Sequence, residues 1–184
     1  RISSRGVGPL AWTVGRAGPI ASSARDLAIM YAATAGVDSR DPDTTFQPPV
    51  DVSDMYGSIE GLRIGVFHEW FEDASAEVVS ACRQVLLKLT QAGASVVDIE
   101  IPDLEALRLA HLVTIVSENT TAMEHVYPDH RTDFGSDTRA NLAIGRHLTS
   151  RDYLKAARIR SRGLANFGAA FEKVDVIATP TTAI

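Results

Sequence analysis

The amino-acid sequence predicts an α/β fold in which three strands are separated by helices. The first observation is a strand–helix–strand pattern over residues 62–101 with short joints, which is typical of a βαβ unit with parallel strands. The second is helical periodicity over residues 104–171, followed by an apolar segment at 174–179. We therefore expect one βαβ unit, a helical region and a late buried strand.

The composition fits a globular chain and excludes several classes of function. The chain has 184 residues, of which 45% are hydrophobic and 22% charged. Its net charge of -5 argues against a nucleic acid partner, because phosphate binding favours a basic surface. One cysteine, Cys82, rules out a framework of internal disulfides.

The first sixty residues predict loops around a single helix. Residues 1–21 are rich in Gly, Pro and Ser and predict turns. The pair Ser22-Ser23 predicts an N-cap for a helix over 24–35, and Gly36 predicts its end. Residues 37–61 predict a polar loop, because Asp and Pro recur along them.

The central part of the chain carries the βαβ pattern. Residues 62–67 predict a strand, and Ser75 predicts the cap of a helix that ends at Ala92-Gly93. Residues 95–101 predict the second strand, which Pro102 ends.

The helical region begins with a predicted helix over 104–127 that Pro128 ends. A polar loop is expected at 128–137, and helices at 138–148 and 152–171. The apolar positions of the first two helices suit either a protein core or the lining of a ligand groove. The positions in question are Leu112, Val113, Ile115, Val116, Met123 and Ile144.

Nucleophilic catalysis requires a serine beside a base, and the sequence offers no such arrangement. The three lysines, Lys88, Lys155 and Lys173, lie in or beside helical patterns with polar neighbours, so we expect them in solvent. Neither Ser3-Ser4 nor Ser22-Ser23 lies in a glycine-rich loop. We expect no catalytic residue in this chain.

Metal and cofactor motifs are also missing from the sequence. No H-x-x-x-H pair and no C-x-x-C pair occurs. His125 and His130, with Asp129 and Asp133, form the nearest cluster to a metal site, and a solvated loop is the simpler interpretation. We expect neither a metal nor a cofactor.

Short blocks in a fixed order resemble the C-terminal portion of the amidase signature family. The blocks are Arg1-Ile2-Ser3, Gly8-Pro9-Leu10-Ala11-Trp12, Gly18-Pro19-Ile20-Ala21, Arg25-Asp26, Ala35-Gly36, Asp38-x-Arg40-Asp41-Pro42, Leu62-Arg63-Ile64-Gly65 and Val174-Asp175-Val176-Ile177-Ala178-Thr179-Pro180-Thr181. The resemblance implies that residues 1–184 are a partial amidase-signature domain, part of a mixed sheet flanked by helices, with a mostly helical segment at 104–171.

The resemblance also implies what the chain lacks. Amidase-signature enzymes cleave amide bonds with a Ser-Ser-Lys triad, and the matching blocks lie after the region that carries it. Both ends of the chain look cut, since it starts at Arg1 without Met and stops just past an apolar strand. We expect that a missing N-terminal half holds the triad and that this chain alone is inactive.

A further set of blocks resembles the plant-type fatty acid amide hydrolases. They are Trp70-Phe71-Glu72-Asp73, Pro102-Asp103-Leu104-Glu105, Ala110-His111, Asp137-Thr138-Arg139, Ser150-x-Asp152-Tyr153, Ala156-Ala157 and Thr179-Pro180-Thr181-Thr182. This resemblance implies a small acyl amide substrate, such as an N-acylethanolamine, and an acyl channel formed partly by the helical region.

Five residues are the candidates for substrate binding. Thr179, Thr181 and Thr182 follow a buried strand, where ligand sites of α/β proteins often lie, although a purely structural turn fits nearly as well. Val113 and Ile144 are the candidates on the apolar helices.

Two other functions stay open: a non-catalytic amidase-like binding module, and a component of a tRNA-dependent amidotransferase. Val14-Gly15 stands where many family members have Leu-Asp, which weighs against the amidotransferase. The expected partners are the acyl amide and the missing N-terminal half, with no nucleic acid. A homodimer and membrane association stay open, and an intracellular location is favoured.

Overall fold

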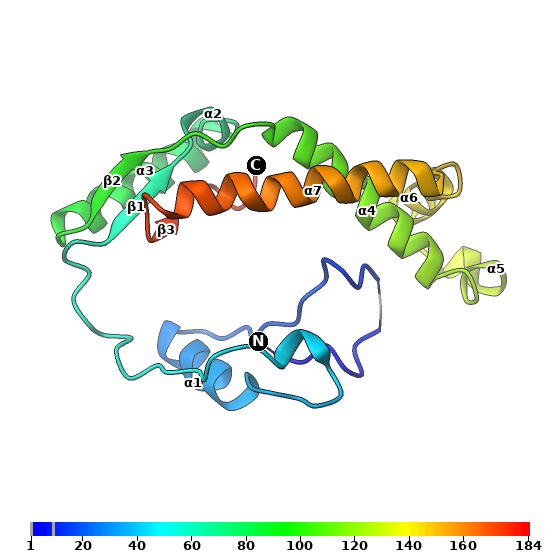
Figure 1. Cartoon of the computed structure of the whole chain (residues 1–184), viewed down its shortest axis with the longest axis horizontal. Helices are drawn as coiled ribbons and strands as arrows, with labels where there is room; N and C mark the ends of the chain where they lie inside the picture. The colour runs from blue at the N-terminus through cyan, green and yellow to red at the C-terminus, as the bar shows by residue number, and fades with distance from the viewer. Residues whose placement is uncertain (1, 9) are drawn as a thin grey trace. The chain divides into compact units, whose positions relative to one another are not determined.

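The computed structural model describes residues 2–8 and 10–184, so the expectations that involve Arg1 and Pro9 lie outside the described residues. The chain folds into two units, which are described one at a time. The first unit contains Arg1–Gly57 and Val113–Thr149, and the second contains Ser58–Leu112 and Ser150–Ile184. Figure 1 labels the helices and strands of both.

The second unit contains the predicted parallel sheet. Its strands are β1 (Arg63–Val66), β2 (Ser95–Asp98) and β3 (Val176–Ile177), in the order β2-β1-β3. β1 pairs with both neighbours in parallel. The α/β prediction is therefore confirmed (Figure 1), but the late strand is not buried as predicted, since Val176 in β3 is 42% exposed.

All three strands are shorter than the sequence predicts, and β1 covers 63–66 of the predicted 62–67. β2 ends at Asp98 rather than at residue 101, and β3 covers only 176–177 of the predicted 174–179. The reason lies in β1, which ends at Val66 and is followed by the short helix α2 (His68–Phe71). The Ile99 N–H donates the last hydrogen bond to β1, at the Val66 carbonyl (3.0 Å), and beyond it the side chains of Ile99 and Ile101 are buried in the core.

Apolar side chains cover both faces of the sheet. One cluster contains Ile99, Ile101, Ala170 and Val174, so that α7 (Ser150–Phe171) packs on this side. The other contains Val66, Phe71 and Val79, which brings α2 and α3 (Ala76–Gln91) together. Cys82 packs beside this second cluster, as expected of a small apolar side chain.

The first unit combines helices with long irregular segments. Its elements are α1 (Ala24–Thr34), the 3-10 turn η1 (Pro42–Thr44), α5 (Tyr127–His130), the 3-10 turn η2 (Arg131–Asp133) and α6 (Ser136–Gly145). The helix α4 (Leu104–Ala122) begins in the second unit and continues into the first.

The helical region corrects two expectations. α4 ends at Ala122 rather than near residue 127, and residues 128–137 contain α5 and η2 in place of a plain loop. Pro128 is the second residue of α5, where a backbone N–H has no partner within the helix, so its missing N–H loses no hydrogen bond. Pro128 therefore lies at the start of a helix rather than after the end of one.

The caps predicted at Ser23 and Ser75 are present, whereas Ser150 is the first residue of α7. The Ser23 side chain accepts a hydrogen bond from the Asp26 N–H at 3.1 Å and begins α1. Ser75 caps α3 in the same way, and Gly93 follows α3 with a φ of 102°, which suits glycine. Local sequence signals therefore place these helix ends correctly.

The helices α4 and α6 approach closely at Gly145. Gly145 is buried, and a Cβ added to it would lie 2.7 Å from the Val116 carbonyl oxygen and would overlap the Thr120 hydroxyl. Only glycine fits at this contact.

Among the described residues, no helix combines the length and apolar character that crossing a lipid bilayer requires.

Candidate functional site

The carboxyl ends of the three parallel strands lie at one edge of the sheet, where α/β folds commonly place ligands. His68 follows β1, Asp98 ends β2, and the turn with Thr179, Thr181 and Thr182 follows β3. The His68 Nε2 atom lies 2.8 Å from the Asp98 Oδ1 atom, and both side chains are exposed.

Backbone hydrogen bonds hold the turn after β3 on both sides. The Ala178 N–H donates to the Gly65 carbonyl at 2.9 Å, and the Ser75 N–H donates to the Ala183 carbonyl at 2.8 Å. Thr179, Thr181 and Thr182 lie between these anchors and are all exposed. The turn therefore combines a fixed backbone with hydroxyl groups that solvent reaches.

A pocket of about 670 Å³ lies beside the same strand ends in the second unit. Trp70 forms part of its wall, with the Arg108 guanidinium 5.0 Å above the ring and 3.6 Å from the Asp73 carboxylate. Most of its polar lining is acidic. The lining residues are Phe67, Glu69, Trp70, Glu72, Asp73, Glu100, Ile101, Pro102, Asp103, Leu104 and Glu105.

The other two candidates, Val113 and Ile144, belong to the first unit. Val113 is half-buried on α4, and Ile144 is 54% exposed on α6. Val116, with an exposed fraction of 3%, belongs to the core. The five candidates thus fall into two groups, one in each unit.

A pocket of about 360 Å³ in the first unit involves residues that sequence reasoning missed. Its lining includes Tyr127, Leu142 and Arg146, with the Arg146 guanidinium 4.8 Å from the Tyr127 ring. Of the positions considered from sequence, Met123 lines it, whereas Val113 and Ile144 do not. No sequence signal marked Tyr127 and Arg146, because their contact joins α5 to the residue that follows α6.

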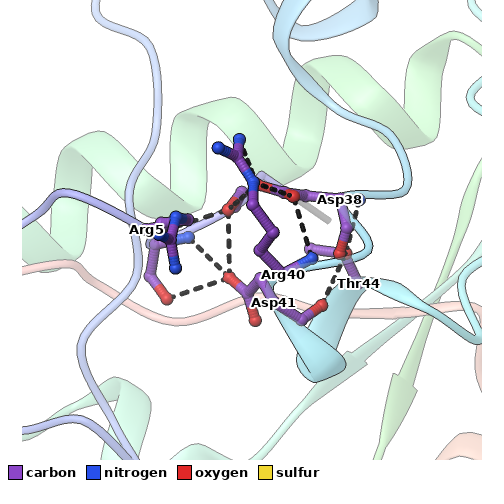
Figure 2. A network of polar contacts seen from close by, with 7 residues as sticks. Arg5, Asp38, Arg40, Asp41 and Thr44 are labelled. Carbon is purple, nitrogen blue, oxygen red and sulfur yellow. Dashed lines mark hydrogen bonds and ion pairs between the residues drawn. The ribbon is translucent and has the colours of Figure 1, made fainter.

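Two aspartates organise a polar network in the first unit (Figure 2). Asp41 Oδ2 accepts hydrogen bonds from the Ser4 N–H at 2.8 Å and from the Ser4 hydroxyl at 3.1 Å. The Ser3 hydroxyl lies 3.0 Å from Asp38 Oδ2. Arg40 pairs with Asp38 Oδ1 at 3.0 Å, and the Thr44 hydroxyl donates to the Asp41 carbonyl at 2.8 Å.

This network keeps its carboxylates ionised. The hydrogen bond from the Arg40 side chain is the main cause that lowers the pKa of Asp38 to about 2. The Ser4 N–H is the main cause that lowers the pKa of Asp41. Carboxylates with low pKa values are weak bases, so Ser3 and Ser4 hold a turn together rather than forming a nucleophile–base pair.

The lysines occupy the positions expected for solvated side chains. Lys88, Lys155 and Lys173 are all exposed, whereas a lysine base needs burial to lose its proton near neutral pH. Of the residues described, no three or more His, Cys, Asp and Glu side chains gather as metal ligands would.

Comparisons with known proteins place the whole chain in one family. The model of the Amidase family matches residues 1–184. A fatty acid amide hydrolase of Oryza sativa subsp. indica is 37% identical over 94% of the chain and 30% of its own length. A glutamyl-tRNA(Gln) amidotransferase component from Oleidesulfovibrio alaskensis is 31% identical over 100% of the chain and 44% of its own length.

A solved structure has the same fold. It is the structure of a vestigial protein complex that reveals the evolutionary origins of an s-triazine catabolic enzyme. The match covers 100% of this chain and 40% of the solved chain, with a TM-score of 0.88 and 29% sequence identity. The chain thus spans less than half the length of the proteins it matches. Because the family model covers every residue, the chain belongs to the Amidase family.

Proposed function

We propose that this chain is the C-terminal part of a C–N bond hydrolase that acts on fatty acid amides such as N-acylethanolamines. The main support is the 37% identity to a plant fatty acid amide hydrolase over 94% of the chain. The amidotransferase component is less similar, at 31% identity. Val14-Gly15, which stands where many family members have Leu-Asp, also weighs against the amidotransferase.

In this proposal, the Ser-Ser-Lys triad lies in polypeptide outside the chain. The serine attacks the amide carbonyl, backbone N–H groups stabilise the oxyanion, and water releases the acyl group. Lys88, Lys155 and Lys173 are all exposed, which supports a catalytic lysine base that lies outside this chain.

The chain itself then contributes the sheet and part of the substrate channel. Thr179, Thr181 and Thr182 form one edge, where a fixed backbone presents accessible hydroxyls. Val113 and Ile144 supply apolar wall, because Ile144 is exposed on α6 and an acyl chain needs apolar contacts. This part forms a partner surface for the rest of the domain as well.

The test is a fusion of this chain to the preceding portion of the rice relative. The proposal expects hydrolysis of oleamide and N-oleoylethanolamine, and loss of that hydrolysis when the serine nucleophile of the added portion is replaced by Ala. Activity on glutamine that depends on tRNA, with none on acyl amides, would favour the amidotransferase instead. A folded fusion that binds acyl amides without hydrolysing them would favour the binding module.

A further inference from the structure

The pocket of about 360 Å³ around Tyr127 contains two opposite charges that do not pair with each other. Its lining, which includes Glu124 and Arg146, belongs entirely to the first unit, and we call it the Tyr127 pocket. Among the described residues, the Glu124 carboxylate has no ion-pair or hydrogen-bond partner, and the Arg146 guanidinium contacts only the Tyr127 ring. Both charged groups therefore keep their hydrogen-bonding capacity for a ligand.

Neighbouring residues hold the Arg146 side chain in place. The Tyr127 ring is buried, and it meets the Phe134 ring edge-on with 5.4 Å between centroids. The Arg146 guanidinium lies over this fixed ring at 4.8 Å. Gly145, directly before Arg146, lies in the close contact between α6 and α4. A guanidinium stacked on an aromatic face keeps the N–H groups at its edge for a carboxylate, so Arg146 is a preorganised anion-binding group.

The other polar groups of the pocket are hydrogen-bond acceptors. The Thr120 hydroxyl donates to the Val116 carbonyl at 2.8 Å, and the Thr121 hydroxyl donates to the Ser117 carbonyl at 3.0 Å. A hydroxyl has a single O–H, so both oxygens can only accept further hydrogen bonds, as the Glu124 carboxylate does. The two threonines lie in the last turn of α4, where the helix dipole favours a positive charge. This side of the pocket suits an ammonium group.

The rest of the lining is apolar. Met123 and Leu142 contribute aliphatic surface, and Leu142 is fully buried at its position on α6. The volume of about 360 Å³ lies at the lower end of the range of ligand pockets, about 300–1,000 Å³. The pocket therefore suits a small molecule that has an apolar body and two charged groups of opposite sign.

We propose that the Tyr127 pocket binds a free amino acid with an apolar side chain. Arg146 binds the carboxylate, while Glu124 and the oxygens of Thr120 and Thr121 accept hydrogen bonds from the ammonium. A single guanidinium matches a singly charged carboxylate, whereas a phosphate carries up to two negative charges. The inference does not depend on amide hydrolysis, since it concerns binding by residues of the first unit alone.

The experiment titrates the pure chain, labelled with carbon-13 at the methionine methyl groups, with leucine and follows the methyl NMR signals. The chain has three methionines, Met30, Met55 and Met123, and all belong to the first unit. Met123 lines the pocket and the other two do not. We expect a saturable shift of the Met123 signal with a Kd of about 1 mM or lower. The signals of Met30 and Met55 should stay in place.

Analogues of leucine test each charged contact without changing the protein. The compound 4-methylpentanoate is leucine without its ammonium, and 3-methylbutylamine is leucine without its carboxylate. Each should have a Kd at least about tenfold higher than leucine, because one charged group of the pocket then loses its partner. Phosphoethanolamine is a zwitterion without an apolar body, and it should also bind more weakly than leucine.

Variants assign each charge to its ligand group. Arg146→Gln should raise the Kd of leucine at least about tenfold and should not weaken the binding of 3-methylbutylamine. Glu124→Gln should raise the Kd of leucine similarly and should not weaken the binding of 4-methylpentanoate. The matched controls are Arg131→Gln and Asp129→Asn, two exposed residues of the same unit that do not line the pocket. They should leave the Kd of leucine within about twofold.

Several outcomes would overturn the inference. They are the absence of a saturable Met123 shift, binding of either leucine analogue as tight as that of leucine, tighter binding of phosphoethanolamine, or equal effects of the pocket variants and their controls. The analogues are compared on the parent chain, so this part of the test holds even if a variant fails to fold. Circular dichroism checks that each variant keeps the helical content of the parent chain.

Discussion

Asp38 and Asp175 each receive hydrogen bonds from an arginine, in different units. Asp38 pairs with Arg40 at 3.0 Å, and Asp175 pairs with Arg63 at 2.7 Å. In each case the arginine side chain is the main cause that lowers the pKa of the aspartate from 3.8 to about 2. Among the described residues, these two aspartates have the most strongly lowered pKa values.

We predict that Arg40→Gln raises the pKa of Asp38 from about 2 towards 3.8, because the amide is neutral and donates a weaker hydrogen bond. Carbon-detected NMR titration of the carboxyl group measures this change. Asp175 serves as the internal control, and its pKa should stay at about 2. An unchanged pKa of Asp38 in the variant would contradict the prediction.

The sign of the pH dependence follows from the same shifts. The folded-state pKa lies below the ordinary value, so the ionised carboxylate stabilises the fold above about pH 4. This contribution decreases as the pH falls from about 4 towards the folded-state value of about 2. Asp38→Asn should therefore weaken the dependence of the unfolding midpoint on pH in that window.

Asp103 has a φ of 61°, the one positive φ of a non-glycine residue in the part of the chain that the structure describes. Its carbonyl accepts the Leu107 N–H at 3.0 Å, so it lies at the start of α4. We predict that Asp103→Val destabilises the protein by about 1–2 kcal/mol, because a β-branched residue strains this conformation. Urea unfolding measures the loss, and Asp103→Gly should cost less than Asp103→Val.

At the scale of the elements, the contact between α4 and α6 depends on Gly145. We predict that Gly145→Ala destabilises the first unit by about 1–3 kcal/mol, because the added methyl group meets the Val116 carbonyl and the Thr120 hydroxyl. The matched control is Gly168→Ala on α7, which has open space around it. That change should stabilise its helix by about 0.5–1 kcal/mol.

Thermal unfolding of both variants gives the comparison. Equal effects of the two substitutions would show that helix propensity, rather than the close contact, dominates at Gly145.

Local signals in the sequence predict most helix starts, whereas non-local pairing decides the lengths of strands. Ser23 and Ser75 mark the starts of α1 and α3 because a cap involves neighbouring residues only. β2 stops early because β1 ends at Val66, which no local pattern around residue 98 reveals. The four-residue helix α2 is too short to produce a periodic signal.

In the candidate site, too, local sequence signals are predictive, whereas contacts between distant residues are not. The position of Thr179–Thr182 at the carboxyl edge could be inferred from strand order alone, because parallel strands align their ends. The pairing of Arg146 with Tyr127 could not be inferred, since it depends on how α6 lies against α5. Binding roles for Thr179, Thr181, Thr182, Val113 and Ile144 stay predictions.

At the scale of the whole molecule, we predict that the pure 184-residue chain does not hydrolyse acyl amides. Its lysines are exposed, and the hydroxyls of Ser3 and Ser4 are bonded to ionised aspartates. The measurement is release of oleic acid from oleamide over time, with a fluorophosphonate probe for reactive serines. Turnover that the probe abolishes would contradict the prediction.

The order of the strands has a consequence for biosynthesis. β1 is the central strand, but its neighbour β3 comes much later, and Arg63 meets Asp175 across 112 positions of sequence. While the ribosome synthesises the intervening segment, the edge of β1 that later pairs with β3 is unpaired. Such an open edge invites pairing with other nascent chains, so chaperone demand should be greatest in this interval of translation.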